Sequence, residues 1–407
     1  MHLLFVTNLY PPYVVGGNEM LCDDVVRGLR RRGHQVSVLC GRGRDLPTDP
    51  DVVGALDLDL DRKEETLLGG RVPSAAEAIR LHFLSTASYA ATRRMIAERR
   101  PDLVVVWNLY MASMAPLVAA VRSGTPVVVH VCDKWLYFGL YDIEALLVAT
   151  VWWKRAALAL ARRTAQPLLR ALARPRRLVA ISDFLKAFYV AAGITPEAID
   201  VEHLGIPTDV FTFAPRAPRP GDAPLKLLFV GSLWEGKGPH TAVRALARLI
   251  HGGIRAHLDI CGSGPESFAK VLRSVIAEEG VADSVTLHGR VERDVVRRLC
   301  QEDDVLVFPS EWDEPFAAVP IEAMSCGMAV VATTAGGTPE AIVDGETGLL
   351  VPPADPEGMA RALARLAADD GLRIRLGANA ARAARARFDL DGYVDRLEAR
   401  YRSLAAS

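Results

Sequence analysis

The stretch Ser310–Gly327 reads S-E-W-D-E-P-F-A-A-V-P-I-E-A-M-S-C-G and decides the fold around it. The apolar run Asp304–Phe308 before it predicts a buried strand. Gly327 is typical of the residue that follows the end of a helix. Pro320 suits the first helical position, where its missing N–H costs nothing. We therefore predict a strand, a loop and then a helix that begins near Val319.

Two carboxylates frame this predicted helix start. Glu314 lies in the loop, and Glu322 falls in the first helical turn, near the positive end of the helix dipole. Backbone amides between them lack acceptors within the helix; they belong to Phe316, Ala317, Ala318 and Val319. Because free amides at a helix N-terminus bind phosphate, we interpret the stretch as a pocket for a sugar nucleotide. The alternative is that two acids near a helix start serve only as caps.

The composition is that of a soluble protein with more than one domain. The 407 residues exceed one hydrophobic core, and a net charge of −1 gives no indication of nucleic-acid binding. The six cysteines contain no C-x-x-C pair, which argues against a zinc site or a disulfide framework. The N-terminal apolar run is too short for a signal peptide, and no segment has the ~20 apolar residues of a membrane helix. We expect a cytoplasmic protein.

Strands and helices alternate along the chain. A strand at Leu3–Thr7, a helix at Asn18–Arg32 and a strand at Gln35–Cys40 form a βαβ opening. Helices are also expected at 75–99 and 111–122, the latter starting at Met111, with Ser182 capping another. Further strands are expected at 103–107, 126–131, 178–181, 225–230, 256–261, 285–287, 305–308 and 329–332. The predicted fold is α/β, with two Rossmann-like, doubly wound parallel-sheet domains. The expected boundaries are 1–205 for the N-terminal domain, 206–223 for a proline-rich linker, 224–386 for the C-terminal domain, and 387–407 for a helix that docks back on the body.

A basic segment lies inside the first half. The region Ala145–Ser182 holds one lysine and seven arginines, all of them within 150–177, and no acidic residue. One interpretation is a basic amphipathic surface that contacts an anionic membrane peripherally, or the acceptor. The other, which we favour, is a helical insertion whose arginines face water.

Loops that follow strands carry glycine or charge. Gly16 and Gly17 follow the first strand but do not form G-x-G-x-x-G, so a nicotinamide-type site is not supported. In the second half, Lys237 could neutralise a diphosphate from a glycine-flanked loop. The other loop residues of that half are Ser232, Gly262, Gly264, Arg290 and Val291. These loops should open on one rim of the sheet, where doubly wound folds bind ligands.

The chain resembles the retaining glycosyltransferases of family four, the glycogen-synthase-like enzymes with two facing Rossmann-like domains and a cleft between them (the GT-B fold). The matching stretches are the E-x7-E pair Glu314 and Glu322, G-S-L-W-E-G-K-G, G-S-G-P-E, H-G-R-V and D-G-E-T-G-L-L-V-P-P-A-D-P-E in the second half, and P-P-Y-V-V-G-G-N-E and R-R-R-G-H-Q-V in the first. The likeness spans nearly the whole chain.

The resemblance implies a role for each matching residue. Glu314 would contact the donor sugar near its reacting carbon, and Glu322 would hold the ribose hydroxyls. Lys237 and the amides after Glu314 would neutralise the diphosphate. Arg290 and Val291 would lie at the base, and Gly16 and Gly17 at the phosphates or the acceptor. The reaction would need no metal and no cofactor besides the nucleotide diphosphate sugar.

The chain departs from the family at three positions. Ser232 stands where an arginine is common, and Ala317 where a glycine is common. The family places a histidine where this chain has Cys132, with Asp133 next and His130 two residues earlier. Residues two apart on a strand share a face, so one reading lets His130 reach the cleft. In the other, His130 is a satisfied strand histidine and Asp133 carries the polar role.

The resulting hypothesis is a retaining, metal-independent transferase that moves a hexose-type sugar from a nucleotide diphosphate sugar to an acceptor hydroxyl. A sugar-nucleotide epimerase or a phosphorylase on the same fold, and a non-catalytic sugar-nucleotide-binding subunit, are the alternatives. A glycosidase fits less well, because its carboxylates flank an open sugar site. The sugar, the base, the acceptor and the oligomeric state are not legible in the sequence.

Overall fold

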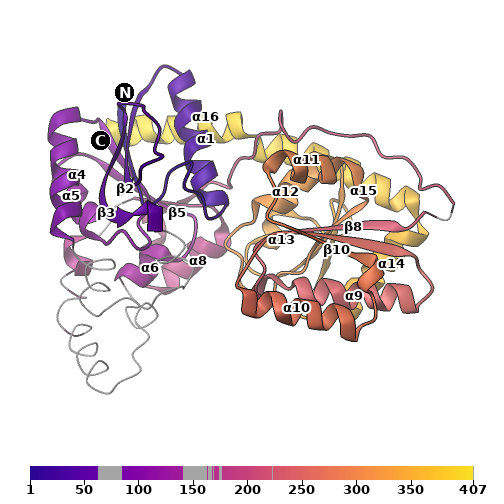
Figure 1. Cartoon of the computed structure of the whole chain (residues 1–407). Coiled ribbons are helices and arrows are strands. Elements are labelled where there is room, and N and C mark those ends of the chain that lie inside the picture. The colour runs from indigo at the N-terminus through magenta and orange to yellow at the C-terminus, as the bar shows by residue number, and fades with distance from the viewer. Residues whose placement is uncertain are drawn as a thin grey trace. The chain divides into compact units, whose positions relative to one another are not determined.

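Two parallel sheets, each built from apolar strands, form the centres of two units (Figure 1). The computed structural model describes residues 1–62, 85–140, 163, 167, 169–173, 177–221 and 223–406. Unit 1 comprises Met1–His203 with Asp391–Ser407, and unit 2 comprises Leu204–Leu390. The start of the helix expected at 75–99 and most of the basic segment 150–177 lie outside the described residues.

Unit 1 contains a seven-stranded sheet with the order β3-β2-β1-β4-β5-β6-β7, in which all neighbours pair in parallel. Its strands are β1 (His2–Thr7), β2 (Gln35–Arg42), β3 (Val52–Asp59), β4 (Leu103–Asn108), β5 (Val127–Val131), β6 (Leu178–Ala180) and β7 (Ile199–Val201). The central strand β4 is buried at every position, as an apolar run between two layers requires.

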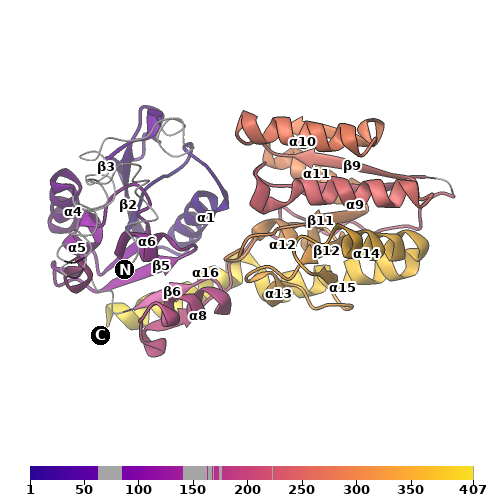
Figure 2. The same cartoon turned by 90° about the horizontal axis from the view of Figure 1, so that it is seen from below.

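The helices of unit 1 are α1 (Gly17–Arg31), α4 (Thr86–Arg99), α5 (Ala115–Val121), α6 (Trp135–Leu140), α8 (Asp183–Ala191) and α16 (Leu390–Ala405), with 3-10 turns η1 (Leu60–Arg62) and η3 (Pro196–Ala198). Helices α4 and α5 pack side by side (Figure 2). Helix α8 begins at the predicted cap, because Ser182 Oγ accepts a hydrogen bond from the amide of Leu185 at 3.1 Å. Helix α5 begins later than predicted, because Met111 and Ser113 both adopt a φ of 63°, which a right-handed helix excludes.

Unit 2 contains a six-stranded parallel sheet with the order β10-β9-β8-β11-β12-β13. Its strands are β8 (Leu225–Val230), β9 (Ala256–Cys261), β10 (Val285–Gly289), β11 (Val305–Phe308), β12 (Ala329–Thr333) and β13 (Leu349–Val351). The helices are α9 (Pro239–His251), α10 (Glu266–Glu278), α11 (Arg293–Glu302), α12 (Ala318–Ser325), α13 (Thr338–Ala341), α14 (Pro356–Ala368) and α15 (Asp370–Phe388), with turns η4 (Glu235–Lys237) and η5 (Ala282–Ser284). In Figure 1, α9 and α10 lie on one face of this sheet and α11, α12 and α15 on the other.

The proline-rich stretch expected to be a linker is packed against unit 2. Phe211 is fully buried, and the guanidinium of Arg216 donates hydrogen bonds to the carbonyls of Asp303 and Cys300. These contacts fix the stretch along the start of β11, although its composition resembles that of a flexible linker.

The C-terminal helix α16 packs on unit 1, beside α1. Its buried side chains Tyr393, Val394, Leu397 and Tyr401 recur at helical spacing and form one apolar face. Gly28 of α1 allows close approach, since a Cβ there would lie 3.0 Å from Val394 Cγ2. In the part of the chain that the structure describes, no helix combines the length and the apolar character needed to cross a membrane.

Candidate active site

Helix α12 begins at Ala318, after the extended residue Ala317 (φ −100°, ψ 130°). Pro320 is thus the third helical residue, not the first, and the sequence prediction of the start was late. The third amide also lacks an intrahelical acceptor, so proline is tolerated there. Glu322 consequently lies in the second turn, which corrects its predicted place in the first.

The first amides of α12 remain available to a ligand. Ala317 has no side chain that caps the helix. Among the described residues, no hydrogen bond outside the helix is donated by the amides of Ala317, Ala318 or Val319. Phe316 precedes them and is buried. This arrangement supplies N–H groups and the positive end of a helix dipole to an anion.

Glu314 lies in the loop before α12, as predicted, with only 3% of its surface exposed. Its Oε1 accepts hydrogen bonds from Lys237 Nζ at 2.5 Å and Ser310 Oγ at 2.8 Å. The amide of Gly337 donates to the Glu314 carbonyl at 2.7 Å. Gly336 has a φ of 57°, and a Cβ there would lie 2.1 Å from that carbonyl oxygen. The backbone and the carboxylate of Glu314 are therefore both fixed.

The loop that carries Lys237 is joined to the loop that carries Glu314. The carbonyl of Gly236 accepts from the amides of Glu311 at 2.8 Å and Trp312 at 3.1 Å. Gly238 has a φ of 67°, and a Cβ there would lie 2.1 Å from the Pro309 carbonyl oxygen. These contacts explain how Lys237 reaches a carboxylate 77 residues away.

Gly262 and Gly264 allow two loops to meet. A Cβ at Gly262 would lie 1.8 Å from the Gly231 carbonyl oxygen, and one at Gly264 would lie 1.9 Å from that of Leu233. The amide of Leu233 also donates to the Ser263 carbonyl at 2.9 Å. Glycine at these two positions therefore lets the two loops approach each other closely. Ser232, between the two contacts, is exposed.

The residues before α11 lie at the end of edge strand β10. Arg290 is exposed and Val291 is half-buried. Arg293, the first residue of α11, contacts Glu322: its Nη2 lies 2.9 Å from Glu322 Oε1. Arg293 was not among the predicted site residues, since nothing in its local sequence pattern points to a partner 29 residues away.

Sequence reasoning also missed Ser310, Gly336, Gly337 and Trp312. Ser310 and the two glycines hold Glu314 directly, and the Trp312 ring lies 5.7 Å from Lys237 Nζ. A signal for the glycines was present. They form a glycine pair in T-T-A-G-G-T-P-E, between strand β12 and helix α13. Gly16 and Gly17 form a similar pair between β1 and the start of α1.

In unit 1, Gly16 and Gly17 form the start of α1 and are exposed. Glu19 accepts hydrogen bonds from the amides of Gly16 at 2.8 Å and Val15 at 3.2 Å. Its carboxylate thus supplies acceptors for two amides at this helix N-terminus. A Cβ at either glycine would meet no atom within 4 Å. Packing within the described chain therefore does not explain why glycine stands at these two positions.

His130 is fully buried in the core of unit 1. Its ring stacks on Trp107 with centroids 4.4 Å apart, and its Nε2 lies 2.6 Å from the Tyr401 hydroxyl on α16. Burial lowers the pKa of His130 to about 3, with a further contribution from Arg400. A neutral, enclosed imidazole favours the reading in which His130 is a strand histidine of the core, but the histidine is only half satisfied, because its buried Nδ1 has no hydrogen-bond partner among the described residues.

Asp133 is half-buried and follows strand β5. Its Oδ1 accepts from the amide of Trp135 at 2.6 Å, and its carbonyl accepts from the Tyr189 hydroxyl at 2.9 Å. Burial, and secondarily the negative charge of Glu19, raise the pKa of Asp133 to about 6. A half-buried carboxyl group with a raised pKa is a better candidate than the enclosed His130 for a polar role at this strand end.

Two family models match the chain. The model "Glycosyl transferases group 1" covers residues 211–383, and "Glycosyltransferase Family 4" covers residues 15–210. A D-inositol 3-phosphate glycosyltransferase from Streptomyces bingchenggensis is 36% identical over 203 residues, which is 46% of this chain and 44% of that relative. A glycogen synthase from Mycobacterium tuberculosis is 29% identical over 94% of this chain and 89% of its own length.

A solved structure gives the fold independently. Sucrose-phosphate synthase from Thermosynechococcus elongatus matches with a TM-score of 0.75 and 20% identity, and the match covers 100% of both chains. The two parallel sheets found here are those of the GT-B fold. With one family model on each half, the chain belongs to the family 4, group 1 glycosyltransferases, which act on nucleotide sugars.

Proposed function

We propose that this protein transfers a hexose-type sugar from a nucleotide diphosphate sugar to an acceptor hydroxyl, with retention of configuration and without a metal. The observation that carries the proposal is the arrangement around α12. A buried carboxylate, an ammonium group and unused helix amides belong to one loop cluster of unit 2.

The diphosphate would bind to the amides of Ala317, Ala318 and Val319, with Phe316 beside them. Lys237 is paired with Glu314, and it would share its charge with the phosphate oxygens when the donor binds. Amides and an ammonium group together supply the positive potential that a metal provides in other sites. The proposal therefore expects full activity in a chelator.

Glu314 would contact the donor sugar near its reacting carbon. Because Lys237 and Ser310 hold Oε1, and the glycine pair holds the backbone, the carboxylate is preorganised. In the proposed reaction, the bond from C1 to the diphosphate oxygen breaks and a bond from C1 to the acceptor oxygen forms on the same face. The acceptor proton passes to the departing phosphate oxygen.

The remaining donor contacts follow the family resemblance. Glu322 would bind the ribose hydroxyls, and Arg290 and Val291 would lie beside the base. Gly262, Gly264 and the exposed Ser232 would border the donor. In unit 1, Asp133 would carry the acceptor-side polar role rather than His130, and Gly16 and Gly17 would lie near the phosphates or the acceptor.

The first experiment is a thermal-shift screen with uridine, guanosine and adenosine diphosphates and their sugars, in EDTA. A true ligand raises Tm by mass action, about 2.7 kcal/mol of stabilisation at a concentration of 100 Kd. The donor that binds is then incubated with acceptor hydroxyls, and the anomeric configuration of the product is read by NMR. An inverted product contradicts retention, and a strict need for added Mg²⁺ contradicts metal independence.

Donor incubated alone tests the epimerase alternative. The proposed transferase would produce no new nucleotide sugar, apart from slow hydrolysis by water. Interconversion of two nucleotide sugars without an acceptor would instead identify an epimerase. Binding with no transfer to any acceptor, but with transfer after a partner chain is added, would favour the non-catalytic subunit.

A further inference from the structure

Glu322 is not an isolated carboxylate on α12. Its side chain is 11% exposed, and its Oε1 accepts a hydrogen bond from Arg293 Nη2 at 2.9 Å. A charge-assisted contact of this length is among the stronger hydrogen bonds in proteins. An arginine from the next helix therefore sets the orientation of the acid that the proposed function assigns to the ribose.

The arginine is itself held on two further sides. Arg293 is the first residue of α11, so its backbone is anchored at a helix start. Its guanidinium lies 5.2 Å from the ring centroid of Phe211, which is fully buried. A cation over an aromatic face gains about 0.5–1 kcal/mol at a partly exposed site. The guanidinium position is thus determined by α11, Phe211 and Glu322 together.

A carboxylate has about four acceptor positions, so the Glu322 carboxylate can bind hydroxyl donors as well as the guanidinium of Arg293. A carboxylate oriented by an arginine is suited to take two vicinal hydroxyl donors, which is the pattern that a ribose presents.

We propose that Arg293 is a positioning residue for nucleotide recognition, which acts through Glu322 on the two ribose hydroxyls of a nucleoside diphosphate. This inference rests on the proposed function, since it requires a nucleotide in unit 2. It adds a residue outside the E-x7-E stretch, from a different helix, to the donor site.

The test is calorimetric binding of nucleoside diphosphates to the full chain, using whichever of the uridine, guanosine and adenosine forms binds the wild type. Arg293→Gln should weaken binding about tenfold. The 2′,3′-dideoxy form of the same nucleotide lacks both hydroxyls, so its affinity should change less than about twofold between wild type and Arg293→Gln.

Arg297→Gln is the matched control. Arg297 lies one turn further along α11, its side chain is also 36% exposed, and it also pairs with an acid, Asp294, at 3.6 Å. Its substitution should leave both affinities unchanged. A Tm of Arg293→Gln like that of the wild type shows that its loss of affinity is not caused by unfolding, and Arg293→Lys tests the charge alone, because it keeps the positive charge.

Glu322→Gln completes a double-mutant cycle. If Arg293 acts through Glu322, then Arg293→Gln added to Glu322→Gln should cost no further affinity. A further tenfold loss in that background, or an equal loss for the dideoxy nucleotide, would overturn the inference while leaving the proposed function intact. If no nucleoside diphosphate binds the wild type, the proposed function fails and the inference fails with it.

Discussion

At the residue scale, the Lys237–Glu314 pair joins donor binding to turnover. Both groups are partly or fully withdrawn from water, with side-chain exposures of 21% and 4%, and they are 2.5 Å apart. Removing one partner leaves the other buried and uncompensated. The substitutions Glu314→Gln and Lys237→Met should therefore have opposite effects on affinity for the nucleoside diphosphate.

Glu314→Gln should lower kcat by about 10²–10³-fold, the size of effect that removal of one preorganised electrostatic group has. Its Kd for the nucleoside diphosphate should stay equal or fall, because Lys237 no longer has a competing carboxylate. Lys237→Met should instead raise that Kd about tenfold or more. Steady-state kinetics and calorimetry measure both quantities. Near-normal kcat in Glu314→Gln would remove this residue from the reaction.

Asp303 provides a second prediction, on stability rather than catalysis. The residue is 2% exposed, and among the described residues its Oδ2 has no hydrogen-bond partner. Burial, and then the charge of Asp259, raise the pKa of Asp303 to about 7, and Lys226 opposes this shift. Since the folded pKa lies above the unfolded one, the native state holds the proton between about pH 4 and 7. Asp303 therefore does not lower the free energy of unfolding at low pH. The free energy of unfolding falls as the pH rises through that window, because the buried carboxyl group must then ionise.

Asp303→Asn should therefore stabilise the protein at pH 8 by on the order of 2 kcal/mol. The gain should shrink toward zero near pH 4, where the native Asp303 is already neutral. Differential scanning calorimetry of wild type and variant across pH 4–8 measures this. Glu278→Gln, at an exposed acid at the end of α10, is the control, and a gain that does not depend on pH would show that charge burial is not its cause.

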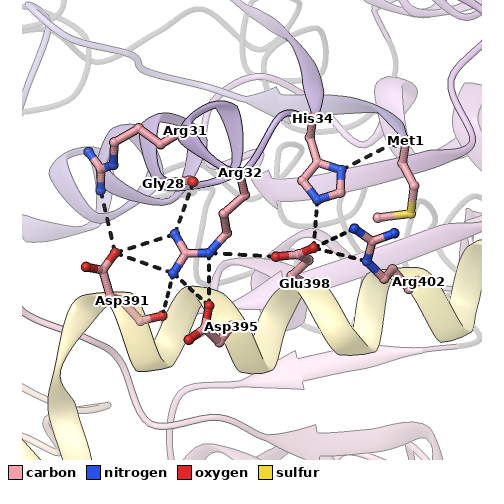
Figure 3. Close-up of polar contacts among 9 residues, drawn as sticks. All are labelled: Met1, Gly28, Arg31, Arg32, His34, Asp391, Asp395, Glu398 and Arg402. Carbon is pink, nitrogen blue, oxygen red and sulfur yellow. Dashed lines mark hydrogen bonds and ion pairs between the residues drawn. The ribbon is translucent and has the colours of Figure 1, made fainter.

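At the element scale, the apolar face of α16 is supplemented by ion pairs with the end of α1 (Figure 3). Arg32 contacts Asp395 Oδ1 through Nη2 at 2.7 Å and Nε at 2.9 Å, and its Nη2 also donates to the Asp391 carbonyl at 3.0 Å. Arg31 makes one longer contact with Asp391, at 3.7 Å. Because both acids are more than 60% exposed, solvent screening reduces the contribution of each pair.

Arg32→Ala should destabilise unit 1 by about 1 kcal/mol, and less in 0.5 M NaCl, where the Debye length is only a few ångströms. Arg31→Ala, one residue earlier on the same helix end, should cost less than about 0.3 kcal/mol. Chemical denaturation at low and high salt compares the two. Equal losses in both variants would mean that the network of Figure 3 adds nothing beyond helix propensity.

The sequence predicted the elements that are built from long apolar runs. Strands β8 and β9 have the predicted bounds: in β8 only Lys226 is exposed, and in β9 buried apolar residues alternate with the half-buried His257 and Asp259. The three-residue strands β7 and β13 were not predicted, whereas β6, which is equally short, was. Strand β3 was missed as well, and its V-V-G-A-L-D-L-D pattern mixes glycine and acids with apolar residues.

The candidate site was predictable only in part. The sequence placed Glu314 in a loop, Lys237 on a glycine-flanked turn and amides before a helix, because each depends on local signals. It could not pair Lys237 with Glu314 or Arg293 with Glu322, because these contacts depend on how distant loops and helices pack. It left His130 undecided, and the deciding contact comes from Tyr401, 271 residues away.

At the scale of the whole molecule, the residues proposed to bind the nucleotide are concentrated in one unit. Lys237, Glu314, the start of α12 and the Arg293–Glu322 pair all lie within Leu204–Leu390. Unit 1 contributes Asp133 and the Gly16–Gly17 turn to the proposal. A nucleoside diphosphate without a sugar should therefore stabilise unit 2 much more than the interior of unit 1.

Hydrogen exchange followed by mass spectrometry tests this division on the intact chain. With nucleoside diphosphate at about 100 Kd, amides in 231–240 and 314–324 should exchange more slowly, because binding opposes local opening by up to about 2.7 kcal/mol. Peptides from the core of unit 1, such as β4 and β5, should change little. The Lys237→Met variant at the same nucleotide concentration should lose most of the protection at 231–240. Protection confined to unit 1 would contradict the assignment of the nucleotide to α12, since it would place the ligand on the half that contains none of the helix amides, Lys237 or Glu322.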